Sequence, residues 1–143
     1  MNEFFANLYE LFGKACLPSS DCAFSNDMYA NGFYVPIGIV MFASIIVVGI
    51  LYYYVINHPR WNRWFWWLFI GLLLAVANSI SAWVMADSML VKYFTEANMN
   101  MPYGMAEFLP FCVIAGCLTL FFFFIFSFII KWGSRNCKHS PFL

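Results

Sequence analysis

Residues 108–130, FLPFCVIAGCLTLFFFFIFSFII, decide the fold, because this stretch of 23 residues contains no charged side chain. Two further uncharged apolar stretches, 36–56 and 64–85, have 21 and 22 residues by subtraction of their bounds. At about 1.5 Å rise per residue, each stretch is long enough to cross the roughly 30 Å hydrocarbon layer of a bilayer. A helix that is apolar on every side is typical of a membrane span. The sequence therefore predicts an all-α integral membrane protein with three transmembrane helices.

The composition excludes most soluble functions. Hydrophobic residues make up 64% of the chain and charged residues 10%, whereas soluble domains average about 25% charged residues. The formal net charge is zero, so no overall field attracts nucleic acid. The expected partners are the lipid bilayer, further copies of this chain, and other membrane or envelope proteins.

Charges flanking the apolar stretches predict the topology. All charged residues of segments 57–63 and 131–143 are basic, whereas most charged residues of segments 1–35 and 86–107 are acidic. The positive-inside rule then puts the N-terminus outside and the C-terminus in the cytoplasm. Because the chain has no Asn-x-Ser/Thr acceptor, we expect a bacterial inner (plasma) membrane. The predicted organisation is an extracytoplasmic segment 1–35, span 36–56, a cytoplasmic turn 57–63, a second helix 64–97, an extracytoplasmic loop 98–107, span 108–130 and a cytoplasmic tail 131–143.

The extracytoplasmic N-terminal segment predicts a short amphipathic helix followed by a disulfide loop. The helix either lies on the outer leaflet or on its own spans, or docks onto a partner. Cys16 and Cys22 lie on the oxidising side, where a bridge between them is expected; the alternative is two free thiols. The apolar residues of the helix recur at helical spacing and are Phe4, Phe5, Leu8, Leu11 and Phe12.

The second helix is predicted to continue beyond the lipid and to end near 98–104, where Asn, Pro and Gly interrupt the pattern. Its extension carries Leu90, Tyr93 and Phe94 on an apolar ridge that needs cover. The N-terminal helix and a neighbouring subunit are the two candidates to cover it.

Small residues in the second and third spans predict close helix packing, with a pore lining as the less favoured alternative. Asn78 lies beside the first stripe and is expected to bond across a helix interface. The stripe on the second span is Gly71, Ala75, Ser79, Ala82 and Ala86, and the shorter face on the third is Cys112, Gly116 and Thr119.

Thioether and thiol groups raise one metal hypothesis. Met85 and Met89 lie one turn apart, and Cys137 and His139 lie in the tail; such soft ligands select Cu(I). Three spans, an outside N-terminus, the Met-x-x-x-Met and the Cys/His tail resemble the high-affinity copper transporter family, which implies Cu(I) transport. The chain departs from that family in its long outer connection, its seven-residue inner turn and the missing glycine pair of the third span.

No spacing in the chain predicts a catalytic site, and no cofactor is expected. The spans contain no charged residue, which argues against a proton relay. We therefore expect a non-catalytic subunit or anchor of a bacterial envelope complex of the secretion or transport type. The alternative is a homo-oligomeric channel or pore-forming protein, with copper transport as a special case.

Overall fold

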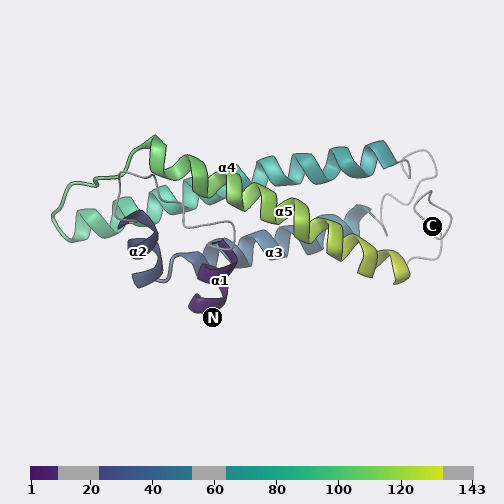
Figure 1. Cartoon of the computed structure of the whole chain (residues 1–143), viewed down its shortest axis with the longest axis horizontal. Coiled ribbons are helices and arrows are strands. Elements are labelled where there is room, and N and C mark those ends of the chain that lie inside the picture. The colour runs from purple at the N-terminus through teal and green to yellow at the C-terminus, as the bar shows by residue number, and fades with distance from the viewer. Residues whose placement is uncertain (10–22, 53–63, 134–143) are drawn as a thin grey trace.

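The computed structural model describes residues 1–9, 23–52 and 64–133, and all regular elements in these ranges are helices. Three long helices run alongside one another, and two short helices lie against the bundle near the start of α3 (Figure 1). This confirms the all-α class. The helices are α1 (Asn2–Tyr9), α2 (Ala23–Ala30), α3 (Tyr34–Ile50), α4 (Trp64–Glu96) and α5 (Met105–Gly133).

Two helices, α4 and α5, are each long and apolar enough to cross a membrane. A third candidate span is the pair of α2 and α3, which are bent by 82° at the break between them. The chain thus has two to three helices that can span a bilayer, which identifies it as a membrane protein. Alone, the 17 residues of α3 reach about 26 Å at 1.5 Å per residue, slightly short of the hydrocarbon thickness.

The bundle has one antiparallel and one parallel pairing around α5. Contacts of Trp67 with Ser127 and of Asn78 with Thr119 set α4 antiparallel to α5. The ring of Phe42 packs on Phe122 with centroids 4.8 Å apart, and Tyr34 packs on Phe111, so α3 runs parallel to α5. One apolar core, shared by all five helices, results.

Helix α2 was not expected, since the whole of 1–35 was predicted to hold one amphipathic helix and a loop. Phe24 and Met28, four residues apart, are buried on one face of α2, which supplies the packing that forms the helix. It ends in a Schellman motif. The N–H of Phe33 donates to the carbonyl of Met28 at 3.0 Å, and that of Gly32 to Tyr29 at 3.1 Å. Gly32 has a φ of +68°, and the chain turns there into α3.

Helix α4 ends at Glu96 in a second Schellman motif, just before the segment 98–104 in which the end was predicted. Asn98 has a φ of +52°, and the N–H of Met99 donates to the carbonyl of Phe94 at 2.9 Å. An asparagine tolerates this left-handed conformation better than most residues do. After the loop, the Glu107 carboxylate accepts a hydrogen bond from the Gly104 N–H at 2.9 Å and so caps the start of α5. Helix α5 begins at Met105, three residues before the predicted start at residue 108.

We predict that Gly32→Ala destabilises the chain by about 1 kcal/mol, because alanine is strained in the left-handed conformation. The site has open space around it, so no steric clash adds to this cost. Unfolding by SDS in mixed micelles, followed by circular dichroism, measures the change. Gly104→Ala is the matched control, since its new Cβ meets only the Glu107 carboxylate at an ordinary 3.7 Å. Equal stability of the two variants would contradict the assignment of the turn.

Candidate functional site

The small residues of α4 and α5 bring these two helices into close contact. A Cβ on Gly116 would lie 2.6 Å from the Ser79 hydroxyl and 3.7 Å from the Ala75 carbonyl oxygen. On the same interface, a Cβ on Gly71 would lie 2.9 Å from the ring of Phe123. A side chain at either glycine would therefore force the facing side chain of the other helix to move. The other predicted packing residues are also buried, namely Ala82, Ala86, Cys112 and Thr119.

Three polar side chains, Ser44, Asn78 and Thr119, join the three long helices; we call them the polar triad. The Asn78 amide donates to the Thr119 hydroxyl at 3.3 Å and accepts from the Ser44 hydroxyl at 3.0 Å. Thr119 donates in turn to the carbonyl of Ala115 at 2.8 Å within α5. Ser44 can alternatively donate to the carbonyl of Met41 in its own helix. Asn78 is 5% exposed, so its polar atoms are satisfied inside the chain and away from solvent and lipid.

A second polar link lies farther along the same interface. The indole N–H of Trp67 donates to the buried Ser127 hydroxyl at 3.1 Å, and the Trp67 ring stacks on Phe123. Tyr52, two residues after the end of α3, is buried against Trp67 and Ile70. Hydrogen bonds thus join α4 to α5 at two levels.

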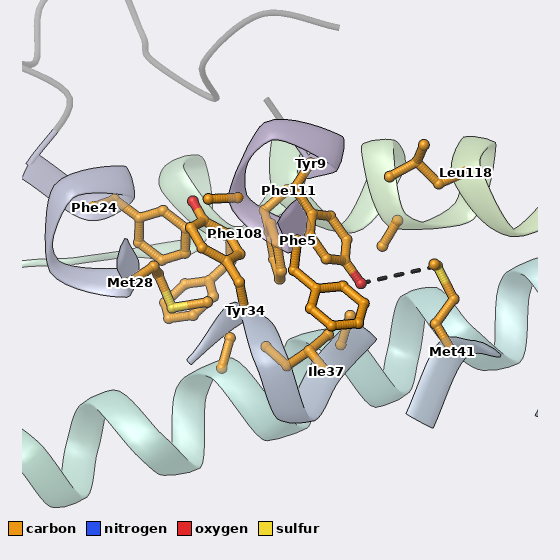
Figure 2. Packing of buried hydrophobic residues seen from close by; sticks show 14 of the residues in the cluster. Phe5, Tyr9, Phe24, Met28, Tyr34, Ile37, Met41, Phe108, Phe111 and Leu118 are labelled. Carbon is orange, nitrogen blue, oxygen red and sulfur yellow. Dashed lines mark hydrogen bonds between the residues drawn. The ribbon is translucent and has the colours of Figure 1, made fainter. Parts of the chain in front are cut away.

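At the opposite end of the bundle, aromatic rings of α1 and α2 pack against α3 and α5 (Figure 2). Tyr9 stacks on Tyr34 with centroids 5.6 Å apart and packs on Phe111 at 5.2 Å, while its hydroxyl donates to the sulfur of Met41 at 3.8 Å. Phe24 of α2 packs on Phe111 at 6.0 Å. We call this group the outer aromatic cluster; its members are Phe5, Tyr9, Phe24, Tyr34, Phe108 and Phe111.

Phe5 sits where α3 has no side chain. A Cβ on Gly38 would lie 2.1 Å from the nearest ring atom of Phe5, so any larger residue there would displace the ring. The ring of Phe5 also packs on Phe42 with centroids 6.1 Å apart. The missing side chain at Gly38 therefore leaves a notch in the surface of α3, in which the Phe5 ring of α1 packs.

One side-chain contact ties α2 to the loop before α5. The Tyr103 hydroxyl donates to the Asp27 carboxylate. Burial of the phenol, then the bond to Asp27, raises the pKa of Tyr103 above its ordinary value. Since the ring of Tyr103 also packs on Phe24 and Phe94, this residue connects α2 with the end of α4.

The residues predicted to bind a partner divide into two groups. Phe5, Leu90 and Phe94 are buried in the chain's own core, so their assignment to a partner surface is corrected. The physical reason is that Phe5 packs at Gly38 of α3, and the ring of Tyr103 in the loop before α5 packs on Phe94. Phe4 and Tyr93 are 61% and 40% exposed. Leu8 is partly buried against the core, and Leu11, Phe12, Cys16 and Cys22 lie outside the described residues.

The weak metal candidates Met85 and Met89 lie on α4. Met85 is partly buried and packs on the core, and Met89 is partly buried too. Within residues 1–9, 23–52 and 64–133, no three His, Cys, Asp or Glu side chains come together as a metal site. Cys137 and His139 lie outside the described residues.

Sequence reasoning missed Ser44, Gly38 and the Tyr103–Asp27 contact. Ser44 is one hydroxyl in an apolar run, and helical spacing alone does not tell whether such a hydroxyl bonds its own backbone or another helix. Gly38 could have been found, because a glycine within a span is often a point of close approach. Asp27 and Tyr103 are 76 residues apart, and no local pattern relates them.

Comparisons with protein-family models, with curated proteins and with solved structures find no match to this chain.

We predict that Asn78→Leu destabilises the bundle by about 1–2 kcal/mol, because it removes two interhelical hydrogen bonds that average about 0.6 kcal/mol each in membranes. Leucine keeps the branching and the number of side-chain heavy atoms of asparagine, so the change removes the polar groups without leaving a cavity. SDS unfolding of the purified chain measures the loss. Ala77→Leu, at the neighbouring exposed position, is the control and should leave stability unchanged. An unchanged midpoint for Asn78→Leu would contradict the role of the polar triad.

We also predict that Tyr103→Phe lowers stability at neutral pH by about 0.5–1 kcal/mol, a small value because the bond is partly exposed. Tyr93→Phe is the control, since that ring is 40% exposed and packs on Phe94. A pKa that is higher in the folded chain gives stability that is complete below about pH 10 and declines above it. The difference in the free energy of unfolding between wild type and Tyr103→Phe should therefore decrease as the pH rises above about 10. A gap that widens there would refute the hydrogen-bond direction.

Proposed function

We propose that this chain is a non-catalytic integral membrane subunit or anchor of a bacterial envelope complex, and that it crosses the inner membrane three times with its N-terminus outside. The observation that carries the proposal is the closure of the bundle on itself. The polar and small residues that could have lined a pathway are used between the helices of a single chain.

The polar triad gives a consistent membrane position for three spans. Thr119 is the central residue of 108–130, with eleven residues on either side by subtraction. A half-thickness of about 15 Å corresponds to about ten helical residues. Counting ten residues either way from the three triad positions gives roughly 34–54, 68–88 and 109–129. The ranges 34–54 and 109–129 contain no charged residue, and 68–88 contains only Asp87, one residue from its end.

The pore alternative receives less support from the same contacts. It requires Asn78 or Ser79 to face a conducting path, but Asn78 is 5% exposed and Ser79 faces Gly116. The lipid-facing surface is formed by large apolar side chains on all three long helices, for example Val47, Val76 and Phe121. Such a surface suits lipid or a neighbouring helix and offers ions no hydrogen-bonding groups.

Exposed apolar side chains outside the lipid support an interaction role. By the same count, Tyr93 lies fifteen residues beyond Asn78, or about 22 Å along the helix, and so outside the hydrocarbon layer. Such side chains mark interaction surfaces more often than idle ones. We call this set the outer patch; its members are Val91, Tyr93, Met99 and Met105, which are 45%, 40%, 63% and 68% exposed.

Purification of the tagged chain from its native membrane in a mild detergent, followed by native mass measurement, tests the proposal. We expect a complex with another protein. Replacing Tyr93, Met99 and Met105 together by serine should release that protein while the helical content stays the same. The matched control keeps these positions apolar as Tyr93→Phe, Met99→Leu and Met105→Leu, and should retain the partner.

Two results would overturn the proposal. One is a complex of a single component that conducts ions in liposomes, with a conductance that changes in Asn78→Ala. The other is a partner that binds the serine variant as well as the wild type. Either result would move support to the homo-oligomeric channel or to a different surface.

A further inference from the structure

Helix α1 has an exposed surface with two chemically different flanks. Its buried face is formed by Phe5, Ala6 and Tyr9. At 100° per residue, Glu3 projects on one side of that face and Phe4 on the other. Glu3 is exposed and Phe4 is 61% exposed. On the same geometry Asn7 lies beside Glu3, and the partly buried Leu8 lies beside Phe4.

The contacts of α1 orient these flanks relative to the bundle. Asn2 lies on the buried face, about 60° from Phe5 in the direction of the polar flank, and donates its amide to the carbonyl of Tyr29 in α2 at 2.7 Å. Phe5, which borders the apolar flank, packs on Phe42 of α3, two residues from Ser44 of the polar triad. The polar flank thus faces the outer end of the bundle, and the apolar flank faces its middle.

The register of α1 against α3 gives its depth. The Tyr9 hydroxyl bonds the sulfur of Met41, which is three residues from Ser44, and Phe5 fills the notch at Gly38, which is six residues from Ser44. These positions are about 4.5 and 9 Å from the level of the triad along α3. Both distances are smaller than the hydrocarbon half-thickness of about 15 Å.

We propose that α1 is embedded in the outer leaflet, with its apolar flank against lipid acyl chains and its polar flank toward the headgroups. The occupant is lipid because the apolar flank lies at the level of the exposed, apolar Ile39 and Val40 of α3, and so continues the bundle's lipid-facing surface. A helix divided in this way is suited to the boundary between hydrocarbon and headgroups. The proposal rests on the three-span membrane position given above.

The test measures the depth of spin labels in the full-length chain, reconstituted in phosphatidylcholine and phosphatidylglycerol vesicles. Single cysteines replace Glu3, Phe4, Val76 or Met99 in a background in which the five native cysteines are alanine. Collision rates with O₂ and with a nickel chelate report contact with lipid and with water. We expect lipid contact at Phe4, with a depth of about 5–10 Å from the bilayer centre, and headgroup or water contact at Glu3.

The two remaining labels separate this proposal from the proposed function. Val76 should report lipid near the bilayer centre and Met99 should report water. If Val76 reported water, the membrane position itself would fail. If Val76 reported lipid but Phe4 reported water, or was shielded from both reagents by protein, only the placement of α1 would fail.

A second measurement avoids the cysteine-free background. A benzoylphenylalanine at position 4 of the native chain, activated by light in the same vesicles, inserts into the nearest C–H bonds. We expect a mass increase of one phospholipid. Cross-linking mainly to a second copy of the chain would refute lipid as the occupant.

Discussion

An asparagine within a membrane span must find hydrogen-bond partners on other helices, and this constraint organises the bundle. In hydrocarbon an unsatisfied amide costs several kcal/mol, so the arrangement in which Asn78 meets both Ser44 and Thr119 is strongly selected among the ways three apolar helices can pack. Apolar contact alone would leave the register of these helices nearly degenerate, because lipid is as apolar as the side chains. The polar triad fixes both the rotation and the vertical position of α3, α4 and α5.

Close approach of the backbones makes this bonding possible. Gly116 lets α5 come near Ser79, and Gly71 accepts the ring of Phe123, so the short Asn78 and Thr119 side chains can reach each other across the gap. Away from the triad the bundle is filled by large rings, and the outer aromatic cluster packs α1 and α2 against α3 and α5. Ring pairs of this kind add about 0.5–1.5 kcal/mol each to the area they bury.

The helical class and the end of the second helix follow from local signals in the sequence. Long uncharged runs fix helices that can cross a bilayer, and Asn98 stops α4 because few other residues enter the left-handed conformation so readily. The partner assignment of Phe5 and Leu90 failed for a physical reason: amphipathicity shows that a face is apolar, and it does not show what covers that face. Which glycine receives Phe5, and which tyrosine meets Asp27, depends on contacts between distant segments that no spacing encodes.

The two ends of the bundle differ in a way that bears on function. Helices α1 and α2 and the end of α4 all gather toward the same end, where Tyr103 and Asp27 connect them, and the aromatic rings there are shared between short and long helices. Helix α1 is held by the ring of Phe5 at Gly38, by the stacking of Tyr9 on Tyr34 and by the bond from Asn2 to Tyr29 of α2. This end of the bundle therefore joins short and long helices through aromatic rings and two polar contacts. The exposed side chains of Tyr93 and Met105, near the end of α4 and at the start of α5, are thus held at the end of the bundle where Tyr103 bonds Asp27 of α2.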